Sequence, residues 1–330
     1  MHQVSRAALC AVGLLALAAV PVSAAGSAYK LVKTIDLPGD KGGHGDWTTF
    51  NPATGMVWLS QSPDHNVVVI DPRTNTVAHV IPDVANSNGI GFAGNYAFAA
   101  DNDSNTIVVI DQKTFAKVAT LTPAGKGPDT VNFLSKEGEI YTSSNSDDAT
   151  IFSATKPFKQ KATMRLRPDP AKDGPDIAVY AAGKDKIYQP NDNMVDVIDA
   201  KSDKIVAVWD PGLTGSAKAA AYDAKTNHLI VGSGEKKMVV LDADSGKVVA
   251  TIAVPGSVDA TVVDETARRA YVGDKSGVVD VIDLDTDKLV DSLPSEKNMH
   301  TLAVDTKTHA VYVYRNESNK VDVFAMNKAS

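Results

Sequence analysis

The chain has 330 residues, of which 43% are hydrophobic and 22% are charged, and its 33 basic and 40 acidic residues give a net charge of −7. This apolar content can build a hydrophobic core, which excludes a disordered chain. A single cysteine excludes a disulfide-stapled fold, and the negative charge argues against nucleic acid or an anionic membrane as the partner.

The first 24 residues have the layout of a secretory signal peptide. Arg6 is the first charged residue, an apolar run covers residues 7–20, and small residues follow Pro21. This run of about 14 residues is shorter than the ~20 needed to cross a bilayer, so we expect no membrane span. The sequence predicts cleavage after Ala24, a periplasmic or secreted protein, and one folded domain over residues 25–330.

One motif, an apolar run that ends in Asp, recurs along the rest of the chain. Its five clear copies lie at residues 67–71, 107–111, 195–199, 238–242 and 278–283, and two weaker copies lie at 149–153 and 320–324. The seven copies are about 42 residues apart, and such a period is typical of a propeller or a solenoid. The repeat therefore argues against a two-domain enzyme.

Each repeat divides into four short strands, which we call a to d. In the sixth repeat the pattern predicts strands over residues 258–263, 269–273, 278–282 and 288–293, separated by turn-forming residues. Four such strands make one blade of a β-propeller, and the small residues of strand a suit innermost strands that converge on an axis. We predict an all-β fold, a seven-bladed β-propeller with four antiparallel strands per blade. An open β-solenoid is the alternative.

The last repeat is completed from the other end of the chain. It supplies three strands of its own, over residues 299–304, 310–314 and 321–324. Residues 29–38 have the pattern of a strand d and precede the first full repeat. We therefore predict that this N-terminal strand closes the last blade, because pairing the two ends removes exposed sheet edges.

The repeat residues resemble those of a known family. Strand c ends in Val-Ile-Asp before a turn that contains Thr, and strand b reads Tyr-Val-Gly at residues 271–273 and Tyr-Val-Tyr at 312–314. With the signal peptide, these features resemble the YncE-like, YVTN-repeat propellers over nearly all of the mature chain. The resemblance implies an exported binding or interaction scaffold. It implies no particular reaction, because the motif residues belong to strands and turns.

The starts of the seven a strands would gather at one mouth of the central channel. Counting back four residues from the end of each strand a gives a polar residue in every blade, namely Asp46, Asn88, Asp129, Asp176, Lys218, Asp259 and His300. Four carboxylates and one lysine leave this ring three charges negative when the histidine is neutral. Repulsion among them would be relieved by a bound cation. We predict a ligand-binding site here, with Asp46, Asp129, Asp176 and Asp259 as candidate metal ligands.

Neighbouring residues extend the candidate site. His44 lies in a Gly-rich segment just before Asp46, where it could act as a metal ligand or as a base, and b–c loops such as residues 145–148 would add contacts. A simpler interpretation is that Asp129 and Asp176, which each follow a proline, only hydrogen-bond to backbone amides where a strand begins. The sequence leaves both interpretations open.

Two classes of function fit this pattern. We favour a non-catalytic, monomeric scaffold that binds a small molecule, a metal ion or a periplasmic partner protein, with a divalent cation as the one cofactor to consider. The alternative is a metal-dependent lyase, lactonase or hydrolase in which the four aspartates hold the ion and His300 or His44 is the general base. The sequence contains no His-Glu-x-x-His, Gly-x-Ser-x-Gly or paired Cys-x-x-Cys motif.

Overall fold

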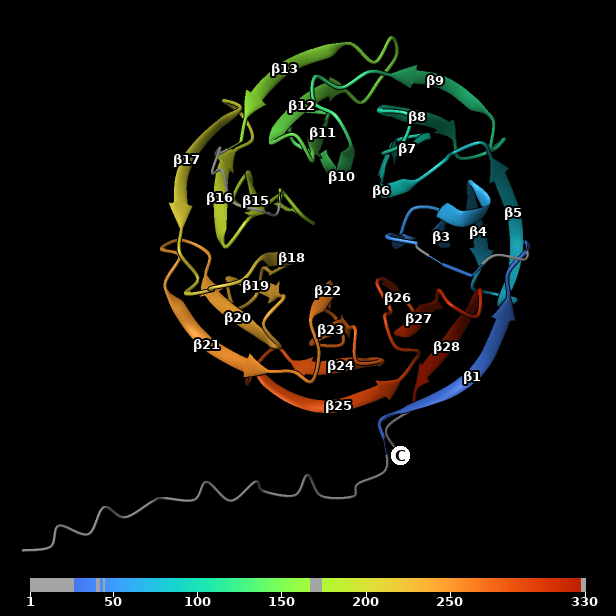
Figure 1. Ribbon diagram of the computed structural model, residues 1–330, viewed down its shortest axis with the longest axis vertical. Helices are drawn as coiled ribbons and strands as arrows, with labels where there is room; N and C mark the ends of the chain where they lie inside the picture. The colour runs from blue at the N-terminus through green and yellow to red at the C-terminus, as the bar shows by residue number, and fades with distance from the viewer. Residues whose placement is uncertain (1–26, 40–41, 44, 167–173, 328–330) are drawn as a thin grey trace, which may run out of the picture.

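A computed structural model describes residues 27–39, 42–43, 45–166 and 174–327. The predicted signal peptide, residues 1–24, and the candidate residue His44 lie outside these ranges. Seven four-stranded antiparallel sheets form a ring of blades around a central axis, as Figure 1 shows. The prediction of an all-β, seven-bladed propeller is therefore confirmed, and the open solenoid is wrong.

In blades 1 to 6, four consecutive strands follow one another from the centre to the rim (Figure 1). Blades 1 to 3 comprise β2 Thr48–Asn51, β3 Met56–Gln61, β4 Asn66–Asp71 and β5 Thr76–Pro82; β6 Ser87–Ala93, β7 Tyr96–Asp101, β8 Thr106–Asp111 and β9 Lys117–Leu121; and β10 Pro128–Leu134, β11 Glu139–Ser144, β12 Asp148–Ser153 and β13 Gln160–Arg165. Blades 4 to 6 comprise β14 Val179–Ala181, β15 Lys186–Asn191, β16 Met194–Asp199 and β17 Lys204–Trp209; β18 Ala217–Asp223, β19 His228–Ser233, β20 Lys237–Asp242 and β21 Val248–Ala253; and β22 Val258–Asp264, β23 Arg269–Asp274, β24 Val278–Asp283 and β25 Lys288–Pro294. One short 3-10 turn, η1 Ser62–Asp64, lies between β3 and β4.

Blade 7 joins the two ends of the chain. Its inner strands are β26 Leu302–Asp305, β27 Ala310–Arg315 and β28 Lys320–Met326, and its rim strand is β1 Tyr29–Asp36. β1 pairs antiparallel with β28, from Tyr29 opposite Met326 to Asp36 opposite Lys320. The predicted closure is confirmed, and Figure 1 shows β1 completing the ring beside β28. β1 ends before Pro38, since a proline has no N–H for a ladder hydrogen bond.

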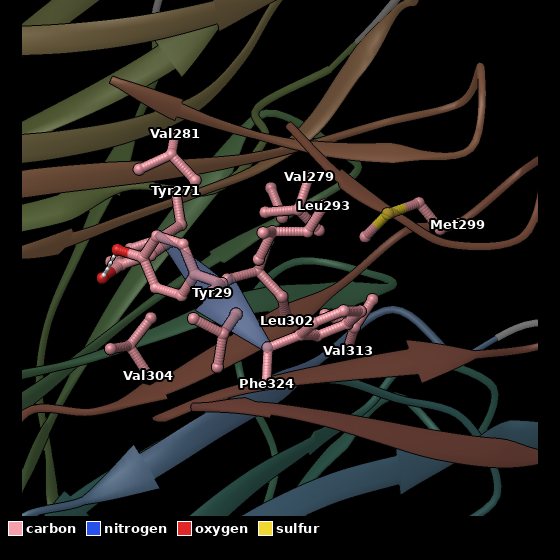
Figure 2. Close-up of a cluster of buried hydrophobic side chains, with 12 residues drawn as sticks. Tyr29, Tyr271, Val279, Val281, Leu293, Met299, Leu302, Val304, Val313 and Phe324 are labelled. Carbon is pink, nitrogen blue, oxygen red and sulfur yellow. Dashed lines mark hydrogen bonds between the residues drawn. The ribbon is translucent and has the colours of Figure 1, made fainter. Parts of the chain in front are cut away.

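The core lies between neighbouring blades. In the described residues the buried apolar side chains form seven clusters, and each cluster draws its residues from two adjacent blades. Figure 2 shows the cluster between blades 6 and 7, where Tyr29 of β1 packs edge-on against Tyr271 with ring centroids 5.9 Å apart. Their hydroxyl oxygens are 2.8 Å apart. The N-terminal strand therefore contributes to packing between blades as well as to the sheet.

The innermost strands come very close to one another. A Cβ atom at Gly89 of β6 would collide with the backbone carbonyl oxygen of Asp129, which belongs to β10 of the next blade. Strand a of blade 7 is also shorter than predicted, since β26 begins at Leu302 and not at residue 299. Met299 lies outside the strand, and its side chain is fully buried in the core between blades 6 and 7. Small residues near the axis thus leave room for seven strands to converge.

Candidate functional site

A cavity of about 360 Å³ lies at one mouth of the central channel. Its wall contains the seven polar residues that were predicted from the a strands, one from each blade. We call these the ring positions, and they are Asp46, Asn88, Asp129, Asp176, Lys218, Asp259 and His300. The propeller therefore brings together side chains that lie up to 254 residues apart in the sequence. We call this space the mouth cavity.

Local irregularity of the a strands exposes the ring positions. In blades 2, 3, 5 and 6 the pairing of strand a with strand b shifts its register at the ring position, for example between Ser87 and Gly89 and between Val258 and Ala260. Such a bulge redirects a side chain away from the regular alternation of the strand. The residue just before every ring position is buried, whereas the ring position itself is half-buried. In these four blades the bulge thus turns the ring-position side chain into the wall of the cavity.

Lysine side chains pair with two of the four carboxylates, and His300 contacts a third as well. Lys218 Nζ lies 3.3 Å from Asp176 Oδ2, and Lys275 Nζ lies 2.8 Å from Asp259 Oδ2. His300 Nδ1 lies 2.6 Å from the same Asp259 oxygen and 3.9 Å from Asp46 Oδ1. When all four carboxylates are ionised and His300 is neutral, the wall remains two charges negative.

Asp129 is the carboxylate whose ionisation costs most in this cavity. Burial and the nearby charges of Asp176 and Asp46 raise the pKa of Asp129 well above its usual value, against a hydrogen bond from Asn88 and the positive charge of Lys218. The Asn88 Oδ1 atom is itself buried and has no hydrogen-bond partner among the described residues. Asp129 thus has a neutral amide as its hydrogen-bond partner, and that amide has an unused acceptor.

Asp176 and Asp259 differ in how their charge is balanced. Burial raises the pKa of Asp176, although Lys218 and the Ile177 N–H group oppose this effect. Burial also acts to raise the pKa of Asp259, but hydrogen bonds from His300 and Lys275 outweigh it and lower that pKa. One cavity therefore holds a carboxyl that resists ionisation and another that is stabilised as an anion.

The simpler turn interpretation holds for part of the ring. Asp176 Oδ1 accepts a hydrogen bond of 2.8 Å from the Ile177 backbone N–H, as expected for an aspartate at the start of a strand. Asp129 instead receives its hydrogen bond from the Asn88 side chain. The two Pro-Asp positions therefore differ: Asp176 accepts a backbone hydrogen bond as well as contacting Lys218, whereas the hydrogen bond to Asp129 comes from a side chain of the wall.

Two residues from b–c turns complete the polar wall: Asn145, which lies in a loop that the sequence predicts to add contacts, and Lys275, which was not predicted as a site residue. A propeller places these turns on the same face as the ring positions, so their place in the repeat was the available signal. His44 lies outside the described residues and has no assigned position. Within the described ranges, no group of three or more His, Cys, Asp or Glu side chains has an arrangement that could hold a metal ion.

Fold and site together define the class of protein: a seven-bladed β-propeller with a charged cavity at one mouth of its channel. No protein-family model matches the chain, and no curated protein is significantly similar to it. The described part of the chain contains no helix with the length and apolar character of a membrane span.

Proposed function

We propose that this protein binds a small organic cation, one that carries a primary ammonium group, in its mouth cavity. The observation that carries the proposal is the convergence of all seven ring positions on one cavity, whose wall holds four carboxyl groups against two lysines. Asp129 is the anchor, because a bound cation would favour its ionised form and offset the repulsion from Asp176 and Asp46.

The lining of the mouth cavity favours an ammonium group over other cations. A primary ammonium has three N–H donors, which suit Asp129 and the neighbouring carboxyl groups of the wall. Quaternary ammonium ions are recognised by the rings of Trp, Tyr and Phe, and the lining of this cavity contains none of these among the residues that the structure describes. A divalent metal ion would be repelled by Lys218 and Lys275 twice as strongly as a singly charged ammonium, and within the described ranges no group of carboxylate and histidine side chains is arranged to hold a metal ion. An organic cation is therefore the better fit.

The test is calorimetric titration of the purified protein with butylammonium chloride. The Asp129→Asn variant should bind at least about tenfold more weakly, since a hydrogen bond to a charged group contributes roughly 1.5–3 kcal/mol. Asp36→Asn is the matched control, because Asp36 is 82% exposed on the rim strand β1 and its loss changes the net charge equally. No detectable binding, or equal weakening by both variants, would contradict the proposal.

A divalent cation remains to be tested directly with the same protein. Melting curves with and without Ca²⁺, Mg²⁺, Mn²⁺ or Zn²⁺ show whether such a cation binds. A ligand at 100 times its Kd stabilises the folded protein by about 2.7 kcal/mol and so raises Tm. A shift that is lost in the Asp129→Asn, Asp176→Asn double variant would assign the cavity to a metal ion and would overturn the choice of an organic ligand.

A lyase or hydrolase is the second candidate function. The observation in its favour is the 2.6 Å contact of His300 Nδ1 with Asp259 Oδ2, because a carboxylate that orients an imidazole is a common arrangement for a general base. Mass spectrometry of the ligand that co-purifies with the protein separates the two functions. A ligand that keeps its mass after prolonged incubation supports binding, whereas conversion to a product supports catalysis.

We also propose that the chain is an exported member of the YncE-like, YVTN-repeat propellers. The support is the Tyr-Val strand b of blades 6 and 7 and the signal-peptide layout of residues 1–24. N-terminal sequencing of the protein from its native source should find a mature chain that begins near residue 25. A chain that still begins at Met1 would contradict export by cleavage.

A further inference from the structure

A second cavity, of about 350 Å³, lies further along the same a strands. It is lined by residues of β2, β14, β18, β22 and β26 and by residues just before or after some of these strands. Most of the lining residues are apolar, such as Phe50, Ala221, Val262 and Leu302. Ile177 belongs to the walls of both cavities. We call this second space the bore cavity.

The order of residues along each a strand explains the change from polar to apolar. In blade 4, Asp176 lines the mouth cavity, Ile177 lines both, and Ala178 and Val179 line the bore cavity. In blade 6, Asp259 lines the mouth and residues 260–263 line the bore. The channel is therefore acidic at one end and apolar beyond it.

The threonines in the wall of the bore cavity do not make its surface polar. Thr48 and Thr261 are 5% and 7% exposed, and their hydroxyl oxygens are enclosed by protein atoms. The surface that the wall presents to the bore is therefore mainly apolar. An occupant of the bore would be stabilised chiefly by removing its own apolar surface from water.

We propose that the ligand is a cationic amphiphile, with its primary ammonium group in the mouth cavity and an apolar chain in the bore cavity. This inference rests on the proposed function and adds the chemistry of the rest of the ligand. The negative wall selects the charged head, and the apolar lining of the bore removes the chain from water. Binding should therefore strengthen about fourfold for each methylene added, until the chain fills the bore.

The experiment is calorimetry of the full chain with butyl-, hexyl- and octylammonium chloride, each below its aggregation concentration. Octyl sulfate is the matched anion, with the same chain and the opposite head charge. Affinity that rises about fourfold per methylene, together with weak or absent binding of octyl sulfate, is the expected result. Octyl sulfate that binds as tightly as octylammonium would overturn the inference, because the acidic mouth would then select nothing.

Two other outcomes are distinguishable. Equal affinity for butyl- and octylammonium would overturn the amphiphile and leave the proposed function intact, whereas no binding of any ammonium would overturn both. A Val262→Phe variant, which narrows the bore, should lose the dependence of affinity on chain length. Val290→Phe is its control, because Val290 is exposed on the rim strand β25. The chain-length series on the unaltered protein decides whether the alkyl chain occupies the bore cavity, even if Val262→Phe does not fold.

Discussion

Asp280 is a buried carboxyl group inside blade 6. It belongs to strand c of the repeat, whereas the ring positions lie at the starts of the a strands. It lies in the middle of β24, is fully buried, and receives a hydrogen bond from the Ser292 hydroxyl. Burial raises the pKa of Asp280 to about 6, although the Ser292 hydrogen bond acts to lower it. Its second oxygen, Oδ2, has no hydrogen-bond partner in the described ranges.

The raised pKa of Asp280 predicts a stability that depends on pH. Between about pH 4 and pH 6 the unfolded chain releases this proton before the folded chain does, so the free energy of unfolding falls as the pH rises. Asp280→Asn should therefore stabilise the protein by up to about 3 kcal/mol at pH 8 and by little at pH 4. Urea unfolding at the two pH values measures this. An equal effect at both would show that the carboxyl ionises normally.

Replacing Asp129 should have opposite effects on the stability of the fold and on ligand binding. Because burial raises its pKa, its ionisation opposes folding at high pH, and Asp129→Asn should raise Tm at pH 8 while leaving it nearly unchanged at pH 4. The same variant should bind butylammonium more weakly. Differential scanning calorimetry at both pH values gives the first result. A lower Tm at pH 8 would mean that Asp129 serves the fold, as the simpler turn interpretation holds.

At the scale of residues, position in the repeat was enough to find the ring positions, but their partners were not predictable. Lys275 reaches Asp259 from a b–c turn of the same blade, and Asn88 reaches Asp129 from the neighbouring blade. Such contacts depend on side-chain conformation across a gap between strands. No spacing in the sequence encodes them.

The rim strand β1 closes the propeller. Tyr29, Ile35 and Leu37 from this segment are buried between blades, and a fully buried side chain of this size contributes about 1.5–3 kcal/mol. A chain that starts at residue 38 should therefore lose a large part of the usual 5–15 kcal/mol of stability and should aggregate through the uncovered β28. A chain that starts at residue 27 is the control. Equal melting temperatures for the two would refute closure by β1.

Gly89 tests how tightly the innermost strands converge. A side chain there would collide with the Asp129 backbone, so Gly89→Ala should destabilise the protein by about 1–3 kcal/mol. Gly183→Ala is the matched control, because a Cβ at Gly183 would meet no atom within 4 Å, and we expect it to change stability by less than about 0.5 kcal/mol. Chemical denaturation of both variants measures the difference. Similar values would argue against close contact of β6 and β10.

At the scale of elements, alternation and turn residues predicted the strands of blade 6 to within one residue at each end. The bulges at the ring positions were not predictable, since a bulge depends on how a strand fits its neighbours near the axis. The late start of β26 also depends on how the strand fits its neighbours. Met299, which was predicted to begin this strand, packs in the core between blades.

In the whole molecule, the ring of blades brings equivalent positions of the seven repeats together in one site. One residue per blade, at the same place in each repeat, becomes one wall of a single cavity. The repeat residues specify this geometry and leave the chemistry to the side chains at the strand starts. The fold was therefore predictable from periodicity, whereas the ligand must be inferred from charge, burial and the shape of the channel.

A crystal structure of the protein grown with octylammonium would show directly where the ligand binds. We predict density for the ammonium group in the mouth cavity, in contact with Asp129, and for the alkyl chain beside Ile177 and Val262. A ligand bound at the rim of the propeller, or ring positions that face separate outer surfaces, would contradict the account.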